Sequence, residues 1–336
     1  MIPHSLPHGT ARLLACFLGV LMLSTSCPTG FAATAALLEL AYTVPLPGVR
    51  GRIDHFALDK EDGRLFVAAL GNDSVEVIDL QARKRSGRIT GLREPQGIGY
   101  VPESKRLFVA NAGGGVDVFE GWPLGRVARI DGLDDADNVR YDVRAARIYV
   151  GYASALGLVD AKARDLAGSI ELAGHPESFQ LESPGSRVFV NVPTAKQIAI
   201  VDRDRRTVIG TWPIGDASAN FPMALDQADH RLLVATRHPA SLLVYDTESG
   251  ARVASLRIGG DADDLFYDAK RKQIYVICGD GVVDVFRQHD ADHYAPAGRI
   301  RTAAGARTGL LADDVLYVAV PAGGASHAEI RAYSLK

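Results

Sequence analysis

Cysteine is scarce in this 336-residue sequence, which contains only Cys16, Cys27 and Cys278. Three thiols are too few for a disulfide framework or for a zinc cluster held by cysteine. A surplus of positive charge is also lacking, because 37 lysines and arginines face 40 aspartates and glutamates. A chain with a formal net charge of −3 has no basic excess to neutralise a phosphate backbone, so we expect no nucleic-acid partner.

The common local signatures of catalysis are missing as well. The sequence contains no C-x-x-C-H for covalent haem, no G-x-S-x-G, no H-E-x-x-H and no phosphate-binding P-loop. What remains is the composition of an ordinary globular protein, with 47 % hydrophobic and 23 % charged residues. This composition excludes a disordered or collagen-like chain.

Residues 1–35 have the layout of a secretory signal. Arg12 is their only charged residue, an apolar run covers 13–23, and small residues follow. This run is too short for a membrane span, which needs about 20 residues. Ala33-Thr34-Ala35 fits a cleavage site for ordinary secretion, whereas Cys27 would be the lipidated residue of a lipoprotein. We therefore predict a signal peptide over 1–35 and a periplasmic or secreted protein, with a lipid anchor at Cys27 as the alternative.

A repeat of about 42 residues runs through the rest of the sequence. Each unit has a polar turn followed by an aliphatic residue, usually an aromatic one, and then valine. The gaps between the central residues of these triplets are all 40 to 44 residues, and such regular self-similarity indicates a repeat architecture. The central residues are Phe66, Phe108, Tyr149, Phe189, Leu233, Tyr275 and Tyr317.

Each unit reads as four short strands separated by turn residues, and no unit shows a sustained helical period. Four strands per repeat of this length are typical of a β-propeller blade, so the seven units predict a seven-bladed propeller. The seventh unit lacks its outer strand. We expect the segment 38–46 to supply it, which would close the ring and remove exposed sheet edges. Residues 36–336 are therefore predicted to form one all-β propeller domain.

Four phrases at the expected start of inner strands point to a family. They are 135–142 (DADNVRYD), 175–180 (HPESFQ), 220–226 (NFPMALD) and 263–268 (DDLFYD). Together with the repeat they resemble the secreted bacterial YVTN-type propellers, the YncE-like family, over almost all of residues 36–336. The literal Tyr-Val-Thr-Asn is absent, and Phe108-Val109-Ala110-Asn111 is a variant of it. The resemblance implies a seven-bladed propeller exported to the periplasm, and it implies no particular biochemical activity.

The loops that enter the innermost strands should meet at one mouth of the central channel, where a concave surface is shared by several blades. Counting back twelve residues from each central residue leads to a polar residue in most units, and a looser alignment of the seventh unit adds Arg307. Arg237 and His238 are expected in a second loop on this side, the one that follows the second strand of the fifth unit. The residues predicted to form a ligand-binding mouth are Asp54, His55, Gln96, Asp137, Asn138, His175, Glu177, Asn220, Asp263, Asp264 and Arg307.

The chemistry of this mouth leaves three alternatives open. An oxygen-rich cluster suits a hard divalent cation such as calcium, and His55 or His175 would also allow zinc. The metal ligands would then be Asp137, Glu177, Asp263 and His55. Alternatively, the polar side chains satisfy one another without any ligand, or an organic ligand places an anionic group on Arg307.

These observations favour a non-catalytic module that binds a small ligand or a periplasmic protein at the channel mouth. One alternative is a metal-assisted hydrolase acting on a lactone or an ester, because a bound metal polarises a carbonyl and lowers the pKa of water. Another is an accessory protein of a redox enzyme. Both alternatives rest on analogy at the level of the fold.

Overall fold

The computed structural model describes residues 37–162, 165–324 and 326–336. The predicted signal peptide and the two candidate processing sites, at Cys27 and at 33–35, lie outside the described residues. Within the described part of the chain the only helical elements are two short 3-10 turns, η1 (Leu70–Asn72) and η2 (Pro193–Ala195). None of the helices found there is long and apolar enough to cross a membrane.

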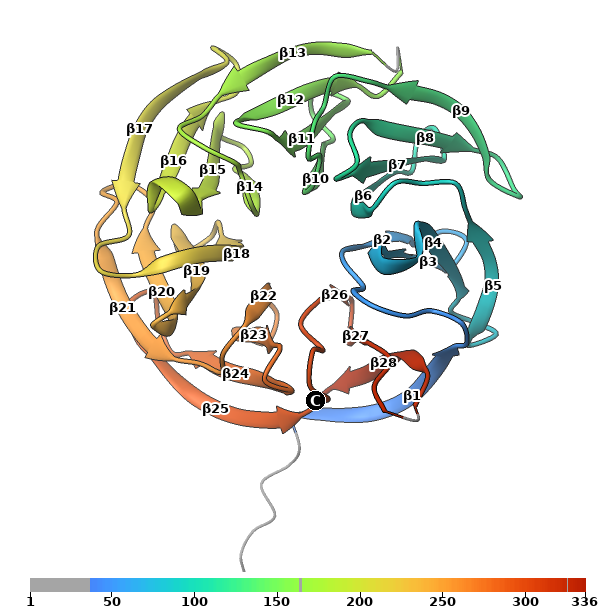
Figure 1. Cartoon of the computed structure of the whole chain (residues 1–336). Helices are drawn as coiled ribbons and strands as arrows, with labels where there is room; N and C mark the ends of the chain where they lie inside the picture. Colours follow the sequence, from blue (N-terminus) through green and yellow to red (C-terminus); the bar gives the residue numbers. More distant parts are fainter. Residues whose placement is uncertain (1–36, 163–164, 325) are drawn as a thin grey trace, which may run out of the picture. The chain divides into compact units, whose positions relative to one another are not determined.

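Seven four-stranded antiparallel sheets are arranged in a ring (Figure 1). From the channel outward, the first three sheets are β2 (Phe56–Asp59), β3 (Arg64–Ala69), β4 (Ser74–Asp79), β5 (Lys84–Ile89); β6 (Pro95–Val101), β7 (Arg106–Asn111), β8 (Val116–Glu120), β9 (Gly125–Ile130); and β10 (Val139–Asp142), β11 (Arg147–Tyr152), β12 (Ala155–Asp160), β13 (Leu166–Glu171). The next three are β14 (Phe179–Leu181), β15 (Arg187–Val192), β16 (Gln197–Asp202), β17 (Thr207–Pro213); β18 (Ser218–Asp226), β19 (Arg231–His238), β20 (Ala240–Asp246), β21 (Arg252–Arg257); and β22 (Ala262–Asp268), β23 (Gln273–Cys278), β24 (Val282–Gln288), β25 (Tyr294–Arg301).

The seventh sheet joins the two ends of the described chain, as the incomplete seventh repeat predicts. It contains β26 (Gly309–Ala312), β27 (Val315–Val320), β28 (Ala328–Leu335) and, outermost, β1 (Leu38–Leu46). Strand β1 pairs with β28 from Leu38 opposite Leu335 to Leu46 opposite Ala328. The predicted all-β fold and its closure by segment 38–46 are thus confirmed.

The repeated triplet forms the second strand of every sheet, and this strand is buried on both of its faces. In β3, Leu65, Phe66 and Val67 are all fully buried. Phe66 packs in a cluster shared with the second sheet, whereas Leu65 and Val67 pack in a cluster shared with the seventh. Side chains alternate across a strand, so one triplet binds a blade to both of its neighbours.

Candidate binding site at the channel mouth

The mouth residues are held by an extension of the sheet ladder that recurs from blade to blade. The backbone amide of Asp54 donates to the carbonyl of Ala68 at 2.7 Å. Asp137 makes the equivalent bond to Gly151 at 2.9 Å, and Glu177 makes it to Asn191, also at 2.9 Å. The backbone of each acid is therefore anchored to the end of a buried second strand.

A polar cavity of about 180 Å³ opens between these anchored loops. Six of the predicted mouth residues line it: Gln96, Asp137, His175, Glu177, Asp263 and Arg307. Its remaining lining residues are Arg52, Asp135, Phe221 and Arg237. The sequence places Arg237 on this side of the ring but does not mark Arg52 and Asp135, because neither stands at the repeated position.

His55 lies deeper, beside a second cavity of about 450 Å³ within the channel. Its Nε2 is 3.7 Å from Asp54 Oδ1 and 3.8 Å from Asp137 Oδ1, and its Nδ1 is 3.6 Å from Asp264 Oδ1. Burial lowers the pKa of this imidazole, but the three carboxylates outweigh burial and raise the pKa to about 10. His55 is therefore a partly buried cation at neutral pH, and a protonated imidazole has no lone pair to offer a metal ion.

Three carboxyl groups of the mouth are difficult to ionise. Burial, reinforced by neighbouring acids, raises the pKa of Asp137 to about 7, that of Glu177 to about 8 and that of Asp263 to about 6. Oδ1 of Asp137 has no hydrogen-bond partner among the described residues. Arg52 Nη2 lies 2.7 Å from Asp54 Oδ2, yet outside hydrogen-bond geometry, so this oxygen too lacks a hydrogen bond there.

Two arginines occupy the other wall of the cavity. Arg237 Nη2 is 2.7 Å from Asp263 Oδ1, and Arg307 Nε is 3.0 Å from Asp263 Oδ2. Both guanidinium groups also reach Asp261, at 3.1 and 3.0 Å, and that of Arg237 stacks 4.2 Å above the centre of the Phe221 ring. The ion pairs and the stacking hold both arginines in place beside the cavity.

Four other predicted mouth residues do not line this cavity, and one of them, Asp54, is fully buried. Asn220 is fully buried, and its amide donates to Asn191 Oδ1 at 3.0 Å and to the Gln197 carbonyl at 3.1 Å. Asn138 is buried next to the cavity without lining it. Asp264 accepts the backbone amide of Gly309 at 2.7 Å and faces the deeper cavity with His55. Asn220 thus connects two blades, while its neighbour Phe221 takes the place at the mouth.

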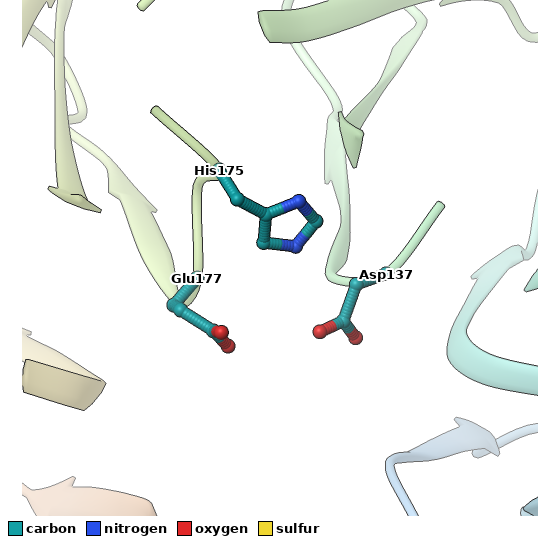
Figure 2. A group of neighbouring side chains, drawn as sticks. All are labelled: Asp137, His175 and Glu177. Atoms are coloured by element: carbon teal, nitrogen blue, oxygen red, sulfur yellow. The ribbon is translucent and has the colours of Figure 1, made fainter. Parts of the chain in front are cut away.

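One group of side chains has the composition and spacing of metal ligands. Asp137, His175 and Glu177 each offer one ligand atom, and these atoms all lie within 4.8 Å of one another. Figure 2 shows the two carboxylates on either side of the imidazole ring, all directed toward a common gap. This set shares Asp137 and Glu177 with the predicted metal ligands and contains His175 in place of His55 and Asp263.

Comparison with known proteins identifies a fold and no family. No protein-family model matches the chain, and no curated protein sequence matches it. A structure of Kuenenia stuttgartiensis hydrazine synthase is similar with a TM-score of 0.71 and 15 % identity, over 81 % of this chain and 95 % of that one. A chain of a mitotic checkpoint complex is similar with a TM-score of 0.76 and 13 % identity, over 97 % and 99 %.

The protein is a seven-bladed β-propeller. Identities this low carry the fold alone, and the fold supports a generic binding or scaffold module. One similar structure is of a hydrazine synthase and the other is of a mitotic checkpoint complex, so together they favour neither the hydrolytic nor the redox-accessory alternative. Any more specific function has to be argued from the channel mouth.

Proposed function

We propose that this propeller is a non-catalytic binding module, and that its ligand is a small organic anion held in the channel mouth. The observation that carries the proposal is the polar cavity of about 180 Å³ into which charged side chains from several blades converge. A cavity of this size admits a small molecule and excludes a folded protein segment. Polar groups that converge in a concave site are what orients a small ligand.

The arginine wall supports an anionic ligand. The hydrogen bonds of Arg237 use its Nε and Nη2, and those of Arg307 use its Nη1. Within the described residues Nη1 of Arg237 and Nη2 of Arg307 therefore remain free to donate. A guanidinium donates well to a carboxylate or phosphate. The raised pKa values of Asp137 and Glu177 let both groups hold protons near neutral pH, which reduces their repulsion of an anion.

We extend the proposal to the cellular location of the protein and to its family. The layout of residues 1–35 supports export to the periplasm or beyond, with the lipid anchor at Cys27 as the alternative. The repeat and the four phrases at 135–142, 175–180, 220–226 and 263–268 support a place among the YncE-like propellers.

The binding proposal is tested by titrating acetate, succinate, citrate, glutamate and phosphate separately into the purified protein, with thermal shift and calorimetry as readouts. A ligand that binds the native state raises the melting temperature by mass action. We expect at least one of these anions to bind, Arg307→Met to weaken it, and Arg301→Met, at an exposed position on outer strand β25, to leave it unchanged. Binding that survives Arg307→Met and Arg237→Met together, or no binding by any of the five anions, would overturn the proposal.

A further inference from the structure

We infer that Asp137, His175 and Glu177 form a binding site for one divalent transition-metal ion, with zinc preferred to calcium. The three residues come from the loops that precede β10 and β14, which are the inner strands of two adjacent blades. The backbone bonds of Asp137 and Glu177 to the second strands hold their loops rigidly. A metal site needs this kind of support, because the ligand atoms have to stay in position when no ion is bound.

A second observation, the burial of an unpaired carboxylate oxygen, distinguishes this cluster from an ordinary group of acidic side chains. Asp137 is only 5 % exposed, lines the cavity, and has an oxygen without a hydrogen-bond partner in the described part of the chain. No hydrogen bond or ion pair to the carboxylate of Glu177 is found among those residues either. A buried polar atom without a hydrogen bond is costly, and a cation bound to the carboxylate of Asp137 would lower that cost.

His175 is already oriented as a metal ligand. Its Nδ1 lies 3.1 Å from the carbonyl oxygen of Ala153, and a carbonyl can only accept, so Nδ1 carries the proton. Asp135 Oδ2, 3.5 Å from the same nitrogen, reinforces this assignment. The lone pair then lies on Nε2, and in Figure 2 this edge of the ring faces the gap between the two carboxylates. A backbone carbonyl that orients the far nitrogen is the usual support of a metal-binding histidine.

The donor set decides the class of ion. Calcium takes six to eight oxygen ligands in proteins and makes little use of nitrogen, whereas an imidazole with two carboxylates suits zinc and its neighbours in the first transition row. A zinc ion held by three protein ligands at the edge of a cavity keeps a fourth coordination position open to a small molecule. This inference deepens the proposed function, because the open position would face the same cavity as Arg237 and Arg307.

The test is calorimetric titration of zinc chloride, and separately of calcium chloride, into chelator-treated purified protein. We expect one zinc ion per chain, bound at least about tenfold more tightly than calcium. His175→Gln and Glu177→Gln should each weaken zinc binding by about tenfold or more. The matched control is His293→Gln, since His293 is exposed in the loop between β24 and β25 and its imidazole hydrogen-bonds only to Asp290 among the described residues. Zinc binding should be unchanged in that variant.

The inference would be overturned by the absence of saturable zinc binding, by a preference for calcium, or by full affinity in either His175→Gln or Glu177→Gln. Melting curves for each variant show whether it is folded, and two independent variants keep the test valid if one of them is not. Anion titration of the same metal-free samples separates this inference from the proposed function. Anions that bind without any zinc site overturn the inference alone, and a zinc site without anion binding overturns the proposed function alone.

Discussion

Replacing Asp137 with asparagine should stabilise the protein, because the structure holds this carboxyl in a place that opposes its ionisation. Burial and the neighbouring acids raise the pKa of Asp137 from 3.8 to about 7. A group whose pKa is higher in the folded state contributes stability below its unfolded pKa and loses it as the pH rises to the folded pKa. For Asp137 this loss takes place between pH 3.8 and about pH 7.

The size of the effect follows from the size of the shift. One pKa unit corresponds to about 1.4 kcal/mol, so ionising Asp137 in the folded protein costs about 4 kcal/mol above pH 7. Asparagine imitates the protonated acid and escapes this cost. In the presence of a chelator we therefore expect Asp137→Asn to be more stable than the wild type at pH 8, by up to about 4 kcal/mol, and equal to it near pH 3.5.

The assay is urea unfolding at both pH values, with Asp59→Asn as the matched control. Asp59 is also a buried acid, but Arg64 donates to its Oδ2 at 2.6 Å and the amide of Asp62 donates to its Oδ1 at 3.2 Å. Burial opposes the ionisation of Asp59, yet these bonds outweigh burial and keep its pKa below the ordinary value. Asp59→Asn should therefore destabilise the protein at pH 8. A loss of stability in Asp137→Asn at pH 8 would refute the reasoning, since it would mean that the carboxylate is already well compensated.

Three further predictions concern the ring and its buried groups. Leu46 in closing strand β1 is fully buried, so Leu46→Ala should lower the free energy of unfolding by about 2–5 kcal/mol, whereas Leu40→Ala, at a position 49 % exposed, should change it by about 0.5 kcal/mol or less. Equal effects of the two variants in urea unfolding would contradict the role of β1 in closing the ring. The pKa of His55 is raised to about 10, so NMR spectra should show its ring protonated from pH 5 to pH 8, and the stability that it contributes should be full below pH 6.5 and lost as the pH approaches 10. Titration of the ring near pH 6.5 would disprove its ion pairing with Asp54, Asp137 and Asp264. Burial raises the pKa of Cys278 to about 12, so Cys278 should react with a thiol reagent at pH 8 only after unfolding, and rapid labelling of the folded protein, seen by mass spectrometry, would exclude its burial.

The ring could be predicted from the sequence because its repeated element is the one with the strongest constraint. The second strand of each sheet packs on both faces, so Leu65, Phe66 and Val67 all have to be apolar. The same demand recurs at a constant spacing, and the seventh unit lacks only the strand that β1 supplies. Strand number, strand order and closure all follow from that pattern.

The mouth could be predicted only in part. Asp54, Asp137, Glu177 and Asp263 stand at a fixed distance before the central triplet, and counting residues finds them. Orientation is not encoded in that count. In the fifth unit the count leads to Phe221, which lines the cavity, whereas the polar residue before it, Asn220, is buried between blades. The register of β18 shifts between Asn220 and Met223, and such an irregularity changes which side chains face the channel.

The residue count does not find Arg52 and Asp135, and it does not show which histidine can bind a metal ion. Arg52 and Asp135 both stand two residues before the repeated position, at a place where the residue type differs from unit to unit. His55 and His175 could not be told apart as metal ligands from the sequence, because their difference arises in three dimensions. Three carboxylates surround the ring of His55, whereas a backbone carbonyl orients that of His175.

The claim that the channel mouth is the binding site is tested most directly by amide hydrogen exchange. Exchange would be measured on purified protein alone, with saturating zinc chloride, and with whichever of the five anions binds most tightly. We expect added protection confined to the loops that form the mouth, in segments 134–138, 175–178, 261–264 and 304–307. Binding that leaves these segments unchanged and protects the outer strands, such as β5, β9 or β17, would contradict it.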